Sequence, residues 1–453
     1  MPLPRPLKTL TLLLSLALGT ALAAPSQAQS LTQVLESARG YDAAWQAARA
    51  QLDASTSRAD QARAGLLPSA ALSAGISRAN TDIHTSVPVP LPGAAQTTQT
   101  LGVNASQPLF RPANRITLQQ GLRGIDLAQA QLDAATQDLL VRVSRAYFDV
   151  LAAQDTLTFV QAQKVAVAEQ LESAKRNFEV GTSTITDSRE AQARFDLITA
   201  QEIATLNDLR VKRMALDQLV GQTGTEPLPL AKPWALPLMV PDNVAAWVLR
   251  SQDSQPQVRQ AQIALDVAQL ETRKAETGHL PTVDLQAGYN IQRTPNGSQL
   301  LPGISSRANS ASVGVALNLP LFAGFAVQNR VRETLALEEK ARADLENLRR
   351  AVAQNTRAAF FGVQSGRGQV RALEAAEASS QSALEANQLG YQVGVRINID
   401  VLNAQSQLFQ TRRDLAQARY NVLLGTLQLR QAAGILLESD VQAIDALLIK
   451  NTP

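Results

Sequence analysis

Residues 282–293 read TVDLQAGYNIQR, and apolar and polar side chains alternate along most of this stretch. Because successive side chains of a strand point to opposite faces, this order predicts a strand with one apolar face and one small, polar face. A length of about ten residues is that of a tilted strand which crosses a membrane. The ordinary alternative for a single run of this kind is a half-buried hairpin in a soluble protein.

Three further runs share this pattern and length, namely residues 310–319, 69–78 and 98–107. Polar loops rich in glycine and proline, residues 84–96 and 294–307, separate the two runs of each pair. Four matching runs favour membrane-spanning strands over soluble hairpins. We expect the two loops on the outer side of the membrane.

The N-terminus has the order of a secretory signal peptide. Two basic residues precede an apolar run over residues 10–18, and small residues follow it. This run is much shorter than the ~20 residues of a membrane-spanning helix. We therefore expect export of the chain and removal of residues 1–28 by cleavage after Ala28, with cleavage after Ala23 as the alternative.

Composition excludes several classes of function. The chain of 453 residues has no cysteine and two histidines, so thiolate metal sites, disulfides and cysteine nucleophiles are absent. Its net charge of +3 is too small to indicate a nucleic-acid partner. We find no phosphate-binding glycine loop, nucleophile motif or metal-ligand spacing, and we expect no enzyme activity, no bound metal and no cofactor.

The same unit occurs twice in the chain. Pro108-Leu109-Phe110 recurs as Pro320-Leu321-Phe322, and Val180-Gly181 recurs as Val393-Gly394. Matches that keep one register over most of each half predict a duplication. The expected division is a signal peptide at 1–28, a first repeat at 29–221, a connecting segment at 222–246, a second repeat at 247–434 and a C-terminal segment at 435–453. We expect the connecting and C-terminal segments to surround the helices as a collar at the equator of the shaft.

Long helices account for most of the remainder. Residues 114–177 contain no proline, and residues 325–390 are their counterpart in the second repeat. Apolar residues recur every seven positions in both repeats: Leu118, Ile125, Leu132, Leu139 and Ala146, and Val401, Leu408, Leu415, Val422 and Leu429. A strict heptad repeat predicts helices that supercoil against partner helices. A fibrous coiled coil is excluded because strand pairs interrupt both repeats at equivalent places.

Four strands from one chain cannot close a barrel, and a membrane does not tolerate open strand edges. The exported chain must therefore assemble with copies of itself. Two copies would give eight strands and a filled interior, whereas three copies would give twelve strands and an aqueous passage. The pattern of residues predicts a β-barrel on an α-helical shaft but leaves the number of copies open.

The chain resembles the TolC family of outer-membrane efflux and secretion ducts over nearly its whole mature length. The most specific motif is GYQVGVRINIDVLNAQ at residues 390–405, whose first-repeat counterpart is FEVGTSTITD at residues 178–187. The resemblance implies an α+β membrane protein: a homotrimer with a twelve-stranded β-barrel and a long α-helical coiled-coil barrel in the periplasm. It also implies docking on a periplasmic adaptor (membrane fusion) protein and on an inner-membrane transporter of the RND, ABC or MFS type.

The resemblance assigns roles to residues near the two helix reversals. Gly181 and Gly394 stand where each long helix turns back, and the family's docking turns lie there. Asp400 and Asn403 match two positions that form acidic rings at the family's periplasmic entrance. Because the second position is Asn403, we expect one acidic ring and weaker cation selectivity.

Four positions match the family's gate, in which contacts between neighbouring helix pairs hold the entrance shut. They are Thr186, Asp187, Tyr391 and Arg396. A simpler role for Asp187 and Asp400 is N-capping of the returning helices, and Glu190 three residues after Asp187 has the spacing of a capping box.

The sequence therefore predicts a passive, trimeric exit duct in the Gram-negative outer membrane, in contact with outer-membrane lipid. The energy for export would come from the inner-membrane partner, because the chain has no nucleotide site. The alternative is a periplasmic coiled-coil scaffold or adaptor whose strand pairs lie in soluble domains. The cargo stays open between drugs, metals and secreted proteins.

Overall fold

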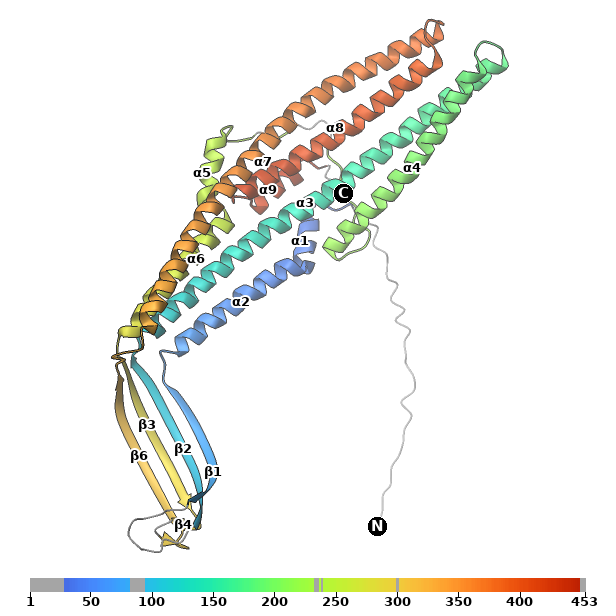
Figure 1. Ribbon diagram of the computed structural model, residues 1–453. Coiled ribbons are helices and arrows are strands. Elements are labelled where there is room, and N and C mark those ends of the chain that lie inside the picture. Colours follow the sequence, from blue (N-terminus) through green and yellow to red (C-terminus); the bar gives the residue numbers. More distant parts are fainter. Residues whose placement is uncertain (1–27, 82–93, 232–235, 238, 299–300, 449–453) are drawn as a thin grey trace, which may run out of the picture.

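The computed structural model shows an elongated molecule with a β-sheet at one end and a bundle of long helices extending from it (Figure 1). It describes residues 28–231, apart from 82–93, and residues 236–448, apart from 238 and 299–300. The expected signal peptide lies almost wholly outside the described residues, and so does most of the first expected loop.

The four expected strands are present and form one antiparallel sheet in the order β1-β2-β3-β6. They are β1 (Ser69–Thr81), β2 (Ala94–Phe110), β3 (Thr282–Thr294) and β6 (Ser306–Asn318). The two repeats meet where β2 pairs with β3. A short hairpin, β4 (Gly297–Ser298) with β5 (Leu301–Pro302), lies in the loop between β3 and β6.

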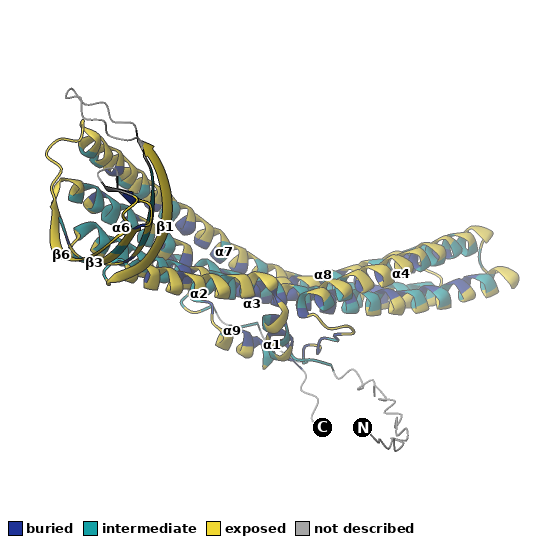
Figure 2. Ribbon diagram, turned by 90° about the horizontal axis from the view of Figure 1, so that it is seen from below, coloured by how far each residue is buried: buried dark blue, intermediate teal, exposed yellow. Residues whose placement is uncertain are grey.

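The pairing register sorts the side chains of the sheet into two faces. One row of paired residues is Leu72–Val103–Tyr289–Ala311, and the next row, displaced by one residue, is Ser73–Gly102–Asn290–Ser310. Most apolar residues of each strand are therefore paired with apolar residues of the neighbouring strands, and most small or polar residues with small or polar ones. One face of the sheet is apolar, the other carries small and polar groups, and both are largely exposed in the single chain (Figure 2).

Six helices build the shaft. They are α2 (Ala43–Ala64), α3 (Pro112–Glu179), α4 (Ile185–Val220), α6 (Pro256–Glu276), α7 (Ala326–Gln392) and α8 (Asn398–Ala432). Near the sheet the lateral order is α2-α3-α6-α7, and toward the far end it is α4-α3-α8-α7 (Figure 1). Among the described helices, none carries a stretch that is both long enough and apolar enough to cross a bilayer.

The heptad positions line the interior of the shaft. In α8 each of the five predicted residues, Val401 to Leu429 in steps of seven, is no more than 2% exposed. In α3 Leu139 is buried, whereas the heptad residues nearer the sheet are partly buried. The sequence pattern therefore predicted correctly which face of α8 packs against its neighbours.

Short segments from three parts of the chain surround the middle of the shaft. They include α1 (Leu31–Tyr41), α5 (Val244–Ser254) and α9 (Glu438–Asp445). The buried hydroxyl of Tyr147 on α3 accepts a hydrogen bond from the Leu228 amide at 2.8 Å and donates to the Gln29 carbonyl oxygen at 3.1 Å. Leu230 forms a β-bridge with Leu448. The N-terminal, connecting and C-terminal segments thus pack together against α3.

A paired ion contact joins the sheet to the shaft. Arg111 directly precedes α3, and its Nε and Nη2 donate to the two carboxylate oxygens of Asp284 on β3 at 2.8 and 2.6 Å. Asp284 is 7% exposed, and a bidentate guanidinium–carboxylate pair fixes relative orientation as well as distance. The contact links the start of the first-repeat helix to a second-repeat strand.

Candidate functional site

Two tight turns lie at the end of the shaft farthest from the sheet (Figure 1). Gly181 joins α3 to α4 with φ +77°, and Gly394 joins α7 to α8 with φ +75°. This left-handed region favours glycine. A Cβ at either position would meet no heavy atom within 4 Å, so backbone conformation selects glycine here, not crowding. The two helix reversals are present at the predicted glycines, and their role in docking stays a prediction.

The prediction that Asp187 is the N-cap of the returning helix was wrong. The N-cap of α4 is Thr184, whose hydroxyl accepts from the Asp187 amide at 3.3 Å, while the Asp187 carboxylate accepts from the Thr184 amide at 3.0 Å. Asp187 is therefore the third residue of a capping box that begins three residues earlier. Asp400 is also the third residue of its helix, but the N-cap there is Ile397, which makes no side-chain cap. Its carboxylate still lies in the first turn, where the helix dipole favours negative charge.

Within each helical hairpin, apolar packing accompanies ion pairs such as Lys164–Glu202 between α3 and α4 and Arg412–Glu377 between α8 and α7. Val167, Leu171 and Ala174 of α3 pack with Ala191 of α4. In the other hairpin Leu384 of α7 packs with Val401 and Leu408 of α8 in the same way. Burial of these side chains holds each hairpin together as a unit.

The contacts between the two hairpins include several polar pairs, most of them between α3 and α8. These pairs are Asn177 Nδ2 with Tyr391 Oη at 3.1 Å, Gln170 with Asn398, Asn398 Nδ2 with the Asp187 carbonyl oxygen at 3.3 Å, Arg413 Nη1 with Gln163 Oε1 at 3.1 Å, and Tyr420 Oη with Asp155 Oδ2 at 2.8 Å. These hydrogen bonds add directional contacts to an apolar cluster that also joins the two hairpins and includes Phe148 of α3 and Leu423 of α8.

Apart from Tyr391 and Asp187, sequence reasoning missed the residues that form these polar pairs, among them Asn398 and Asn177. Asn398 is 1% exposed and contacts both α3 and α4, so it joins the start of α8 to the other hairpin. A signal was available in α3, where Gln163, Gln170 and Asn177 stand seven residues apart. Polar residues at heptad spacing indicate a polar strip on one helix face.

Arg396 and Asp400 form an ion pair next to the second turn. The Arg396 Nη1 lies 3.6 Å from the Asp400 Oδ2, and the two side chains are 58% and 34% exposed. Asn403, one turn further along α8, accepts a hydrogen bond from Arg194 Nη2 of α4 at 2.9 Å. Both positions expected at the entrance therefore have a basic neighbour within the same chain.

Within one chain, the hydrogen bonds and ion pairs of the predicted gate residues go to other partners. Asp187 belongs to the capping box, Tyr391 accepts from Asn177, Arg396 pairs with Asp400, and Thr186 is exposed at the start of α4. Contacts between neighbouring chains are what the resemblance implies for them. The assignment of these four residues to a gate stays a prediction.

Exposed apolar side chains surround both turns. They are Phe178, Val180 and Ile185 at the first turn, and Leu389, Val393, Val395 and Ile397 at the second, each between 43% and 79% exposed. Apolar groups gathered at the end of a shaft are typical of a surface that another protein covers.

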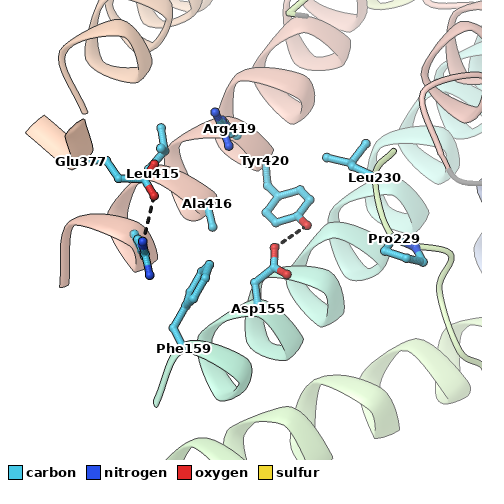
Figure 3. A pocket seen from close by; sticks show the side chains of 10 residues that line it. Asp155, Phe159, Pro229, Leu230, Glu377, Leu415, Ala416, Arg419 and Tyr420 are labelled. Carbon is cyan, nitrogen blue, oxygen red and sulfur yellow. Dashed lines mark hydrogen bonds and ion pairs between the residues drawn. The ribbon is translucent and has the colours of Figure 1, made fainter. Parts of the chain in front are cut away.

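A cavity of about 630 Å³ lies between α3, α8 and the connecting segment (Figure 3). Its wall is a mixture of charged and apolar side chains, including Phe159, Leu415 and the pair Arg412–Glu377, whose Nε and Oε1 are 3.0 Å apart. Burial, together with the nearby Asp155 carboxylate, raises the pKa of the Tyr420 hydroxyl. Across the described parts of the chain there is no group of acidic and histidine residues that could hold a metal ion.

The two edge strands of the sheet, β1 and β6, each have one unpaired edge in the single chain. In the shaft α7 is at one lateral edge while α2 and α4 form the other. A sheet with one apolar face and two unpaired edges, continued by a helical layer with two open sides, defines one protomer of a membrane channel.

Comparison with known proteins agrees with this class. The chain belongs to the outer membrane efflux protein family, whose sequence profile matches residues 34–222 and, a second time, residues 247–435. Two matches to one profile confirm the duplication. The structure of the outer membrane protein VceC from Vibrio cholerae superimposes with a TM-score of 0.76 and 19% identity, covering 89% of this chain and 96% of that chain.

Two relatives are similar in sequence. The outer membrane protein TolC of Vibrio cholerae is 34% identical over 439 residues, which cover 97% of this chain and 98% of the relative. The alkaline protease secretion protein AprF of Pseudomonas aeruginosa is 30% identical over 76% of this chain and 71% of its own length. The chain is therefore an outer-membrane exit duct for efflux or type I secretion with its helices in the periplasm, and the scaffold alternative is not favoured. The family is one of channels, not of enzymes.

Proposed function

We propose that three copies of this chain close into one continuous passage and that the passage is passive. The observation that carries the proposal is the pair of open edges on a sheet whose two faces differ in polarity. If β6 of one protomer pairs with β1 of the next, the antiparallel order continues around the ring, since β1 and β6 run in opposite directions. Three copies then give twelve strands with no free edge, an apolar outside and a lumen lined by small polar groups.

The proposed partners would supply the energy for export and connect the duct to the inner membrane. A passage without an energy source needs an inner-membrane transporter, of the RND, ABC or MFS type, and an adaptor that bridges the periplasm. The exposed apolar side chains around Gly181 and Gly394 support docking of the adaptor at the two turns. The apolar outer face of the barrel would contact outer-membrane lipid. The name of the alkaline protease secretion relative makes a secreted protein one candidate cargo.

We further propose that the two turns of each chain form the periplasmic entrance, where Asp400 repeats three times around the axis. Carboxylates brought together in this way attract cations. Asn403 is neutral and bonds to Arg194, so it adds no second acidic ring. The entrance should accordingly show only weak cation selectivity.

The gate gives a direct test of this entrance. Arg396→Ser combined with Tyr391→Phe removes one cation and one hydroxyl that accepts from Asn177, and we expect a several-fold higher single-channel conductance in planar bilayers. Loss of the Asn177–Tyr391 contact, which joins the two hairpins, lets them move apart, and loss of Arg396 removes a cation next to the second turn. Arg350→Ser is the matched control, because Arg350 also pairs with a carboxylate one turn away but lies far along the shaft. Conductance equal to that of the unmodified channel would refute the gate assignment, although not the duct itself.

A further inference from the structure

We propose that Gly390 is a positioning residue, which seats the Arg396 side chain and thereby sets the charge at the entrance of the duct. The inference rests on the proposed function of the turns as that entrance. A Cβ at Gly390 would lie 2.7 Å from the Cγ and 3.3 Å from the Cβ of Arg396. Both atoms belong to the base of the side chain, so a methyl group could be accommodated only by a different Arg396 rotamer or by a change of the turn.

The backbone does not require glycine at position 390. Gly390 lies within α7 and is absent from the residues with positive φ. Its carbonyl oxygen accepts hydrogen bonds from the amides of Val395 and Arg396 at 2.8 and 3.0 Å, which ends the helix. Any residue can provide such a carbonyl group. A glycine within a helix destabilises it relative to alanine, so the absence of a side chain at position 390 needs another reason.

The first turn of the same chain supplies the comparison. Asn177 takes the place of Gly390, and Ser183 takes the place of Arg396, at the constant offset between the repeats. The Asn177 carbonyl oxygen accepts from the amides of Thr182 and Ser183 at 2.8 and 3.2 Å, the same pattern as in the second turn. The backbone of this turn therefore tolerates a side chain at its helical position. In the first turn the larger residue Asn177 is followed six positions later by the small residue Ser183. In the second turn the order of sizes is reversed, and Gly390 is followed six positions later by Arg396.

The packing of Arg396 over Gly390 affects the charge near Asp400. With its stem over Gly390, Arg396 places Nη1 3.6 Å from the Asp400 carboxylate. An exposed pair of this kind, four residues apart, contributes little to stability. The guanidinium nevertheless compensates the one carboxylate that would form the acidic ring. Displacing Arg396 exposes Asp400 in all three chains at once and makes the entrance more negative.

The test is the cation preference of Gly390→Ala. We expect the permeability ratio of K⁺ to Cl⁻, taken from the reversal potential in a KCl gradient, to rise by about twofold. Arg396→Ser should give the same rise. Adding Gly390→Ala to Arg396→Ser should then change nothing further, because this double variant, like the first turn, has a side chain at the helical position and serine six positions later. Gly368→Ala is the matched control, because Gly368 is also a helical glycine of α7 but its Cβ would meet no heavy atom within 4 Å, and it should leave the ratio unchanged.

A second measurement does not depend on conduction. Phenylglyoxal modifies accessible guanidinium groups, and mass spectrometry of the folded, detergent-purified protein should show faster modification of Arg396 in Gly390→Ala than in the unmodified chain. A shift in selectivity with Arg396→Ser but none with Gly390→Ala would refute the claim that Gly390 positions Arg396. Equal labelling of Arg396 in the two proteins would refute it as well. If the unmodified chain forms no channel, the duct proposal fails, and the labelling result still decides the role of Gly390.

Discussion

Replacing Val313 with arginine should prevent insertion of the assembled protein into the outer membrane. Val313 lies in the middle of β6, is 80% exposed in the single chain and pairs with Ala287 of β3 on the apolar face. An arginine that faces lipid near the middle of a bilayer costs about 2–4 kcal/mol. Because the ring repeats the change in every chain, the total reaches on the order of 10 kcal/mol, enough to abolish insertion.

Ser312→Arg is the matched control for this change. Ser312 is the adjacent residue of the same strand, pairs with Gly288 and lies on the polar face. Its arginine would face the water-filled lumen, so the protein should reach the outer membrane and differ only in ion selectivity. The measurement is the amount of heat-modifiable protein in outer-membrane extracts. Normal insertion of Val313→Arg together with failure of Ser312→Arg would mean that the two faces have been assigned the wrong way round.

A second large effect is expected at the first turn. Gly181→Trp should leave the protein assembled in the outer membrane and abolish export. The position is exposed, with no heavy atom within 4 Å of a Cβ, so the indole has room within the chain. It would instead occupy the space next to Phe178 and Val180, where we propose that the adaptor docks. The readout is the intracellular level of compounds and proteins that accumulate in host cells deleted for the chain.

Gly224→Trp separates docking from backbone strain. Gly224 also has a left-handed backbone, with φ +79°, and its Cβ would likewise meet nothing within 4 Å. It lies in the connecting segment after α4, away from the turns. Both variants carry a penalty of about 1–2 kcal/mol for a side chain in this conformation, but only Gly181→Trp should block export. Export at the normal level by Gly181→Trp would contradict docking at this turn.

The strands and helices of this fold could be predicted from the sequence because apolar residues recur at a different spacing in each kind of element. Alternation at residues 282–293 and its three counterparts predicted four strands, and all four pair in the phase that the apolar positions require. The heptad spacing from Val401 predicted the buried face of α8. Both periods are properties of single segments, so no knowledge of neighbouring segments is needed.

The contacts at the turns could not be predicted in the same way. The capping box formed at Thr184 because the hydroxyl and the Asp187 carboxylate bond reciprocally, whereas the spacing of Asp187 and Glu190 was an equally good sequence match. Burial of Asn398 depends on which helices of the two hairpins face each other. A single sequence does not specify that choice, and the crowding between Gly390 and Arg396 depends on the path of the turn.

The central claim is that three copies of this chain close into one membrane channel. Native mass spectrometry of protein extracted in detergent from outer membranes tests it most directly, since the mass counts the chains in the intact assembly. We expect three chains and no other species of comparable abundance. A monomer or dimer in the outer membrane, or a chain recovered only from the soluble periplasmic fraction, would contradict the claim.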